Sequence, residues 1–211
     1  MKIDRAGFPF IAAALVPALG LLAVRRTGWA LGCAGLAGFF TYFFRDPERR
    51  VPDGAGLVVS PADGRVMVAG AVEADTAPPG DWVQITIFLS PLDVHINRTP
   101  LSGRVTRIEY RPGRFLPAYR PESRENERNE LWLDHGGQPV VVRQVVGILA
   151  RRIVCRVAEG DVLATGERIG LMKFGSRMDV FLPPSAGLRV RVGDRVRGGE
   201  TVLAVLAGPA G

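Results

Sequence analysis

Two long apolar runs occupy the start of the chain, and an alternation of polar and apolar residues begins only after them. The runs Phe8–Val24 and Trp29–Phe44 contain no charged residue. Each is close to the lower limit of the about 17–25 residues that a helix needs to cross a bilayer. A second apolar run follows the first without a clear small-residue cleavage site, which argues against a signal peptide. Residues 1–50 are therefore predicted to form a membrane-inserted helical hairpin and a basic linker.

The basic residues around this hairpin predict its orientation. Arg25 and Arg26 lie in the turn, and more basic residues flank the outer ends, namely Lys2, Arg5, Arg45, Arg49 and Arg50. Positive charge is enriched on the cytoplasmic side of membrane proteins. A hairpin that spans twice would therefore leave both termini, and the domain that follows, in the cytoplasm. Because Pro9 and Pro17 interrupt the first run, a shallow re-entrant hairpin is the alternative.

The pattern changes to β structure after the polar, proline-rich segment Asp46–Gly54. In Trp82–Leu89 apolar residues alternate with others, as in a strand with one buried face. Glycine and proline separate further runs of this kind, which are Val105–Tyr110, Glu130–Leu133, Val140–Leu149, Ile153–Val157, Ile169–Phe174, Met178–Leu182, Leu188–Val192 and Thr201–Leu206. Residues 51–211 are therefore predicted to form one β domain without a long amphipathic helix.

The β region contains two internal repeats. The segment Gly160–Ile169 matches Gly193–Val202 in the pattern Gly-Asp-x-aliphatic-x-x-Gly-Glu-x-aliphatic, and Pro-x-x-Gly-x-Val occurs at Pro61–Val66 and Pro100–Val105. Both patterns resemble turns of biotinyl and lipoyl carrier domains, which are flattened β-sandwich hybrids. The predicted fold is therefore mainly β and barrel-sandwich-hybrid-like, with a duplicated domain as one version of it.

Charge points to a lipid partner more than to a nucleic acid. The net charge is +6, with 27 Lys and Arg against 21 Asp and Glu, and most of the basic residues are Arg. Basic charge beside a membrane anchor favours anionic lipid, and we find no nucleic-acid motif and no Cys/His spacing for a metal. Arginines and aromatic residues are interleaved between Arg107 and Arg128. This segment is either a solvated loop or a lid that lies on an anionic membrane and brackets a lipid headgroup.

The dipeptide Gly175-Ser176, at which two of the apolar runs meet, is the candidate for covalent chemistry. A Gly-Ser pair between strands is usually only a turn, but the flanking Phe174 and Met178 leave no room for an ordinary polar loop. The Ser176 hydroxyl could attack the Gly175 carbonyl and convert the peptide into an ester. Elimination would then give dehydroalanine, which hydrolyses to a pyruvoyl group. A pyruvoyl group condenses with amines and acts as an electron sink.

Such chemistry needs a base, and the chain has two histidines. His95 follows the strongly alternating strand, whereas His135 is predicted to be a turn residue in Asp134–Gly137. Asp63, in Pro61-Ala-Asp-Gly64, is a turn residue by default. Together Asp63, His95 and Ser176 would form an acid–base–nucleophile set of the catalytic-triad kind. The sequence does not show whether these three residues meet.

The chain resembles a known family, the short, membrane-associated form of phosphatidylserine decarboxylase. The resemblance covers nearly the whole chain and rests on the order of several motifs. These are Phe44-Arg-Asp-Pro47, Pro61-Ala-Asp-Gly64, Ser90-Pro-Leu-Asp-Val-His95, Asn126-Glu-Arg-Asn129, Gln144–Ile153 and Lys173-Phe-Gly-Ser-Arg177.

The resemblance implies self-cleavage between Gly175 and Ser176, which gives a β chain of residues 1–175 and an α chain of residues 176–211. The α chain would start with a pyruvoyl group made from Ser176. This group would form a Schiff base with the serine amine of a phospholipid in an anionic membrane, and loss of carbon dioxide would give phosphatidylethanolamine. By the same analogy Asp63 and His95 act in processing or proton transfer. Expected headgroup contacts are Arg98, Asn126, Glu127 and Arg128.

One position departs from the family pattern. Longer members carry a second histidine three residues after the first, and this chain has Arg98 there. In those members processing and decarboxylation are divided between the two histidines. Here His95 either serves both steps or shares them with water or another group.

Two other functions remain open from the sequence. Leu171-Met-Lys173-Phe resembles the hairpin of a carrier module that is biotinylated or lipoylated on its lysine. A membrane-anchored, non-catalytic β-domain adaptor is the second alternative. Within the decarboxylase hypothesis, the sequence leaves open whether the lipid is a phosphatidylserine or an archaetidylserine.

Overall fold

The computed structural model describes residues 2–72, 77–148, 152–173 and 176–207. Gly175, half of the predicted cleavage site, therefore lies outside the described residues. The chain divides into two compact units, residues 1–48 and 49–211. The predicted boundary was at residues 50 and 51. The roles assigned to the two parts, a membrane hairpin and a self-cleaved decarboxylase domain, stay predictions.

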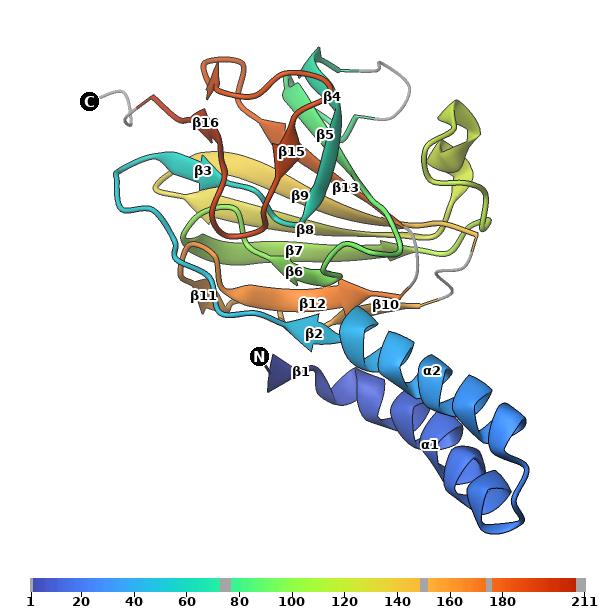
Figure 1. The fold of residues 1–211 in the computed structure, drawn as a ribbon. Coiled ribbons are helices and arrows are strands. Elements are labelled where there is room, and N and C mark those ends of the chain that lie inside the picture. Colours follow the sequence, from blue (N-terminus) through green and yellow to red (C-terminus); the bar gives the residue numbers. More distant parts are fainter. Residues whose placement is uncertain (1, 73–76, 149–151, 174–175, 208–211) are drawn as a thin grey trace. The chain divides into compact units, whose positions relative to one another are not determined.

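The first unit is a pair of helices closed by a short strand pair. It contains β1 (Lys2–Ile3), η1 (Arg5–Gly7), α1 (Phe8–Ala23), α2 (Thr27–Phe43) and β2 (Arg45–Asp46). The two α-helices lie side by side and antiparallel (Figure 1). The turn between them contains Arg25, whose φ of 58° is in the left-handed region. The predicted hairpin is therefore confirmed as a pair of helices, and Pro17 lies inside α1 without ending it.

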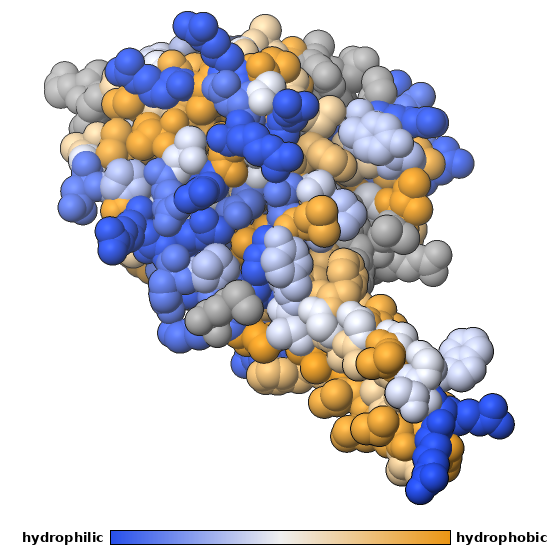
Figure 2. Space-filling view, in the orientation of Figure 1, coloured by the Kyte–Doolittle hydropathy of each residue, from blue (hydrophilic) through white to orange (hydrophobic). Residues whose placement is uncertain are grey.

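The helix pair exposes a largely apolar surface (Figure 2). Large hydrophobic side chains such as Val16, Trp29 and Leu31 are about two-thirds exposed or more, at 68%, 74% and 68%. One helix, Arg5–Ala23, is long and apolar enough to cross a membrane, with a mean hydropathy of 2.0. The second helix, α2, has 17 residues. Apolar side chains exposed in this number are typical of a surface that another apolar phase covers.

The second unit is built from antiparallel strands. An eight-stranded sheet has the order β11-β7-β8-β9-β13-β5-β4-β15, and it curls around an interior that two three-stranded sheets, β10-β12-β6 and β14-β16-β3, help to close (Figure 1). The strands are β3 (Leu57–Val59), β4 (Gly64–Ala71), β5 (Val83–Leu89), β6 (Ile96–Arg98), β7 (Gly103–Arg111), β8 (Arg128–His135), β9 (Gln138–Val146), β10 (Ile153–Cys155), β11 (Val162–Leu163), β12 (Arg168–Met172), β13 (Ser176–Leu182), β14 (Gly187–Leu188), β15 (Arg195–Val196) and β16 (Val202–Val205).

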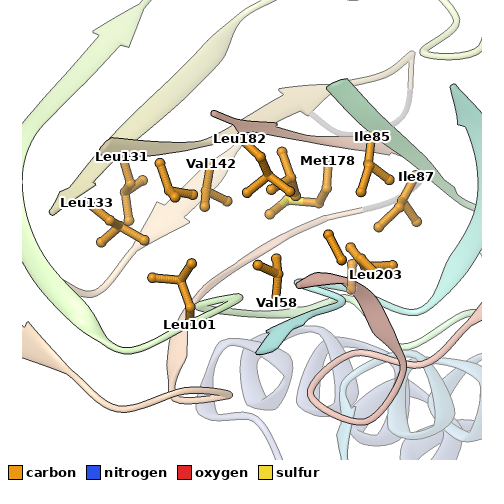
Figure 3. Close-up of a cluster of buried hydrophobic side chains, with 14 of the residues drawn as sticks. Val58, Ile85, Ile87, Leu101, Leu131, Leu133, Val142, Met178, Leu182 and Leu203 are labelled. Carbon is orange, nitrogen blue, oxygen red and sulfur yellow. The ribbon is translucent and has the colours of Figure 1, made fainter. Parts of the chain in front are cut away.

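Strand β13 lies between β9 and β5 in the middle of the large sheet. Because side chains alternate across a strand, Met178, Val180 and Leu182 point into the interior. There they pack with residues of the facing sheets such as Val58 and Leu203 (Figure 3). Burial of these side chains holds β13 in register with both neighbours, since a slip of one residue would turn each of them outward.

The sequence repeats occupy equivalent places at the two edges of the large sheet. Gly160 and Gly193 both have a positive φ, 94° and 98°. The Gly160 amide donates to the Val105 carbonyl at 2.7 Å, and the Gly193 amide donates to the Val66 carbonyl at 2.9 Å. Each repeat thus pairs its edge strand, β11 or β15, with the strand that follows a Pro-x-x-Gly motif. The likeness to biotinyl and lipoyl domains stays a prediction.

The structure corrects several predicted strand boundaries. The predicted strand Val105–Tyr110 is confirmed within β7, which begins at Gly103, ends at Arg111 and pairs with β8. The predicted irregular segment therefore starts after Arg111 and not at Arg107. The predicted strand Leu188–Val192 is reduced to β14, Gly187–Leu188. Strand β4 was missed because its sequence, GRVMVAGA, is rich in small residues and shows little alternation. A mainly β domain preceded by a helix pair is confirmed.

Candidate active site

Ser176 is the first residue of β13, and its side chain is completely buried. Its register partners are Leu89 on β5 and Val146 on β9. Both partners are buried, so the Ser176 side chain points to the interior of the curled sheet. Among the described residues the Ser176 hydroxyl has no hydrogen-bond partner. A buried hydroxyl without a partner costs about 1–3 kcal/mol, and such an atom is often explained by a catalytic role.

His95 lies directly before β6 and is 2% exposed. Its carbonyl accepts a bond of 3.4 Å from the amide of Met172, the last residue of β12. Met172 precedes Ser176 by four residues, so the fold brings His95 to the segment that leads into β13. The His95 Nδ1–H donates to the Asp93 carbonyl at 2.9 Å. In the neutral ring the lone pair is therefore on Nε2, which is the nitrogen that can take a proton.

Asp63 makes its bonds elsewhere. Its carboxylate accepts two bonds from Nη2 of Arg49, at 2.9 and 2.8 Å, and one from the Gly198 amide at 2.8 Å. Within the described part of the chain, these bonds tie Asp63 to residue 49 and to the turn after β15. The structure therefore does not join Asp63 directly to His95 or Ser176. A catalytic role for Asp63 stays a prediction.

Three of the predicted headgroup residues bond neighbouring backbone, and their contact with a headgroup stays a prediction. Arg98 is buried, and its Nη1 donates to the Gly166 carbonyl at 2.9 Å. The Asn126 amide donates to the carbonyls of Leu116 and Val146, at 2.7 and 2.8 Å. The Glu127 carbonyl accepts from the amide of Val146, the residue opposite Ser176. Asn126 and Glu127 thereby fix the end of β9 beside Ser176.

Arg128, the fourth predicted headgroup residue, lines a pocket of about 250 Å³ on the other face of the sheet. The lining residues are Ser123, Arg124, Glu125, Arg128, Arg143, Val145 and Arg177. Burial lowers the pKa of the Arg128 guanidinium, and the positive charge of Arg143 lowers that pKa further. Four guanidinium groups around a small pocket favour an anionic ligand.

The charges behind this pocket are paired and deeply buried. Arg143 Nε donates to Glu130 Oε1 at 2.9 Å, and both side chains are less than 5% exposed. Arg177 Nε lies 3.1 Å from Asp179 Oδ1, and Arg177 Nη1 donates to the Ser123 hydroxyl at 2.9 Å. Because Arg177 neighbours Ser176 in sequence but points the opposite way, the pocket and the buried serine share one end of β13.

Sequence reasoning missed a row of three buried amide side chains. Asn129 Nδ2 donates to Gln144 Oε1 at 3.1 Å, and Gln144 Nε2 donates to Asn97 Oδ1 at 2.8 Å. Asn97 Nδ2 is buried and has no partner among the described residues. We call this row the amide ladder. The sequence signal was Gln144 itself, a polar residue on the inward face of the apolar run Val140–Val146.

His135 lies outside this arrangement, and Lys173 lies between β12 and β13 on the approach to Ser176. His135 ends β8 opposite Gln138, whereas β8 approaches the Ser176 end of the sheet at Arg128. The His135 Nδ1–H donates to the Ser102 carbonyl at 2.6 Å. Lys173 directly follows β12 and is half-buried.

The chain is similar to known proteins over nearly its whole length. The phosphatidylserine decarboxylase family profile matches residues 36–204. The chain is 51% identical over 205 residues to a phosphatidylserine decarboxylase proenzyme of Symbiobacterium thermophilum, with 95% of this chain and 94% of that protein covered. Similar proenzymes of Nitrosomonas europaea and Azorhizobium caulinodans are 44% and 45% identical, over 96% and 97% of this chain and 94% and 89% of theirs.

The chain belongs to the phosphatidylserine decarboxylase family. Members of this family are pyruvoyl-dependent carboxy-lyases that are made as proenzymes, and the pyruvoyl group derives from a serine. Ser176 fits this origin, since its buried hydroxyl has no competing partner among the described residues and it stands at the start of a strand.

Proposed function

We propose that Ser176 is the serine that becomes the pyruvoyl group, and that the chain cuts itself between Gly175 and Ser176. The products are a β chain of residues 1–175 and an α chain of residues 176–211. The observation that carries this proposal is the buried Ser176 hydroxyl, which has no partner among the described residues. Ser176 starts β13 and lies four residues after Met172, whose amide donates to the His95 carbonyl. The mature enzyme converts phosphatidylserine to phosphatidylethanolamine and carbon dioxide.

His95 is the proposed base for processing and the proton donor for turnover. Its Nδ1–H is held by the Asp93 carbonyl at 2.9 Å, so the ring orientation is fixed and Nε2 is the exchanging nitrogen. The pyruvoyl group would supply an electron sink for the electron pair that the departing carboxylate leaves on the α-carbon. His95 then returns a proton to the carbon that has lost carbon dioxide. With Arg98 bonded to the Gly166 carbonyl, His95 serves both steps.

The pocket of four arginines is the proposed site for the phosphodiester of the substrate headgroup. It opens beside Arg177, one residue from the reacting position, and Arg124, Arg128 and Arg143 converge on it. Guanidinium groups bind phosphate oxygens in a bidentate way. In a serine phospholipid only two carbons and one oxygen separate the amine nitrogen from phosphorus. A lipid held by its phosphate in this pocket therefore has its amine near the end of β13.

The helix pair is the proposed membrane anchor, with the β domain on the cytoplasmic side. Its apolar exposed surface and the span Arg5–Ala23 support insertion. The basic residues at its outer ends support the orientation. An anionic bilayer surface would concentrate the basic β domain at its substrate.

The proposed function is tested by the fate of the full-length chain. Ser176→Ala removes the nucleophile, so we expect one uncleaved chain without decarboxylase activity, as measured by denaturing gel and intact mass. Ser60→Ala is the matched control, because Ser60 is also completely buried but bonds the Ala62 carbonyl; it should yield two chains. Cleavage of Ser176→Ala would falsify the proposal. A wild-type chain that stays intact and gains mass at Lys173 would favour a carrier module.

A further inference from the structure

Two completely buried side chains on the interior side of the β domain each carry a polar atom without a partner among the described residues. These atoms are the Ser176 hydroxyl and Asn97 Nδ2. The hydroxyl belongs to the central strand of the large sheet, and Asn97 belongs to β6 in the facing sheet. Two unpaired buried atoms near one reacting residue indicate a function in the reaction.

Strand register places these atoms in one region. Ser176 pairs with Val146 and Met178 pairs with Gln144, so Gln144 is the diagonal neighbour of Ser176 on the inward face. Diagonal neighbours on one face are separated by about 7–8 Å. Asn97 is bonded to Gln144 at 2.8 Å across the interior. His95, two residues before Asn97, is bonded to Met172 on the approach to Ser176.

The amide ladder has a direction. Asn129 donates to Gln144, Gln144 donates to Asn97, and the remaining donor of the row is Asn97 Nδ2. Because Asn97 Oδ1 accepts from Gln144, Asn97 Nδ2 lies on the side of the amide group away from that bond. The ladder is uncharged, so it offers a donor without burying an ion.

We propose that Asn97 is the oxyanion donor for self-cleavage and that Gln144 and Asn129 are positioning residues that hold its N–H in place. This inference rests on the proposed function of Ser176. A neutral, preorganised N–H in a dry interior stabilises developing negative charge without reorganisation. The structure thereby assigns a group that the acid–base–nucleophile set of the sequence did not contain.

The reaction balances with water as the only co-reactant. The Ser176 oxygen attacks the preceding carbonyl carbon as His95 removes its proton, and the carbonyl oxygen becomes the oxyanion that Asn97 stabilises. Collapse breaks the carbon–nitrogen bond, and the nitrogen takes the proton, which leaves an ester. Loss of the Ser176 α-proton then breaks the carbon–oxygen bond and releases the Gly175 carboxylate. Water converts the dehydroalanine to pyruvoyl and ammonia.

The direct test is Asn97→Asp in the full-length chain, made by pulse-labelled cell-free synthesis with lipid vesicles and followed by gel. The substitution keeps the acceptor for Gln144 and replaces the N–H donor with a carboxylate oxygen, which also adds a buried negative charge. Asn97→Leu, an uncharged variant that also lacks the donor, separates loss of the donor from the added charge. We expect cleavage to slow by about 10²- to 10³-fold, the usual effect of losing one oxyanion donor. The matched control is Thr99→Val, since the buried Thr99 hydroxyl bonds the Leu101 carbonyl outside the ladder; it should cleave within about twofold of wild type. Cleavage of Asn97→Asp at the control rate overturns the inference.

Hydroxylamine identifies the step, because it cleaves esters much faster than amides. If Asn97 stabilises the first oxyanion, Asn97→Asp should accumulate no ester, and hydroxylamine should release no more α chain than it does from Ser176→Ala. If hydroxylamine releases α chain from Asn97→Asp as fast as from wild type, the ester forms at the normal rate. The defect would then follow the acyl shift, which contradicts an oxyanion role. Cleavage of Ser176→Ala itself would instead overturn the proposed function.

Asn129→Asp tests the direction of the ladder from its far end. An aspartate can only accept, so Gln144 would turn its amine toward residue 129 and its oxygen toward Asn97. Asn97 would then donate to Gln144 and present its oxygen to the Ser176 side. We expect cleavage to slow by at least about tenfold. The effect would act through Gln144, since Asn129 pairs in register with Gln144 and not with Ser176. Asn129→Ser, which can still donate, should restore most of the rate. Equal rates for the two variants contradict a positioning role.

Discussion

The two faces of strand β13 carry different chemistry although they alternate residue by residue. The inward face presents Ser176 and Met178 to an apolar interior that contains the uncharged amide ladder. The outward face presents Arg177 and Asp179 to a network of buried charges around the arginine pocket. In a dry interior an isolated charge is costly and a nucleophile is best served by neutral donors. Anions are bound well by guanidinium groups, and in this pocket the guanidinium groups of Arg143 and Arg177 are held by carboxylates.

One strand can therefore serve bond formation on one side and substrate binding on the other. Its period of two residues places Ser176 and Arg177 on opposite faces at a single chain step. The reacting position is at the strand end, where both faces are within reach. Substitution of inward polar residues should therefore alter the rate of chemistry, whereas substitution of outward charged residues should alter stability and substrate affinity.

The largest expected effect is on the inward side. His95→Ala should slow both self-cleavage and decarboxylation per pyruvoyl by about 10²- to 10⁴-fold, the usual contribution of a positioned acid–base group. Gel densitometry of the pulse-labelled chain and carbon dioxide release per α chain measure the two steps. His135→Ala is the matched control, because His135 lies at the far end of β8 and bonds Ser102. Normal rates of both steps in His95→Ala would make His95 only structural.

The next effect is on stability and belongs to the outward side. Glu130→Gln removes the carboxylate that Arg143 Nε bonds at 2.9 Å, while the ion pair between Arg143 Nη1 and Asp179 Oδ2 is longer, at 3.9 Å. Breaking a buried ion pair by removing one partner costs about 3–5 kcal/mol, which urea denaturation of the detergent-solubilised protein measures. Glu125→Gln removes the exposed pair with Arg114 and should cost at most about 1 kcal/mol. Equal losses of free energy of unfolding in the two variants would contradict burial of the ion pair between Glu130 and Arg143.

A smaller effect is expected on substrate affinity. Arg124→Ala removes one guanidinium from the pocket, so KM for phosphatidylserine in mixed micelles should rise about tenfold, with kcat per pyruvoyl nearly unchanged. Arg104→Ala is the control, because Arg104 lies on β7, is exposed and bonds the Gly160 carbonyl away from the pocket. A fall in kcat at constant KM would contradict binding of the headgroup phosphate here. The water-soluble phosphoserine, tested as a competitor, separates headgroup binding from attraction to the membrane surface.

The smallest effect is expected for a change of shape at constant volume on the inward face. Met178→Leu keeps the core filled and should cost less than about 1.5 kcal/mol in free energy of unfolding. Its self-cleavage rate should match wild type, since Met178 packs in the core and makes no polar contact with the ladder. A large loss of cleavage with unchanged stability would show that core shape, and not only the donors, controls the reaction.

Several features of this protein were determined by local sequence. The helix pair followed from two uncharged, mostly apolar runs, and α1 and α2 begin and end within about two residues of those runs. Strand β5 followed from its alternation. The equivalence of the repeats followed from matched glycines, since positive φ is required at both turns. The order of motifs sufficed for the family.

Tertiary structure alone decided which side chains meet. Asn97, Asn129 and Gln144 come from three strands, and no local pattern indicates that their amides form one row across two sheets. Tertiary structure also decided the partners of Asp63, because Arg49 and the Gly198 amide, which both donate to its carboxylate, are far apart in the sequence. Local patterns report which face of a strand is apolar, but a buried polar group is paired only when the sheets close around the interior. That closure sets the ladder beside Ser176 and leaves Asp63 with Arg49.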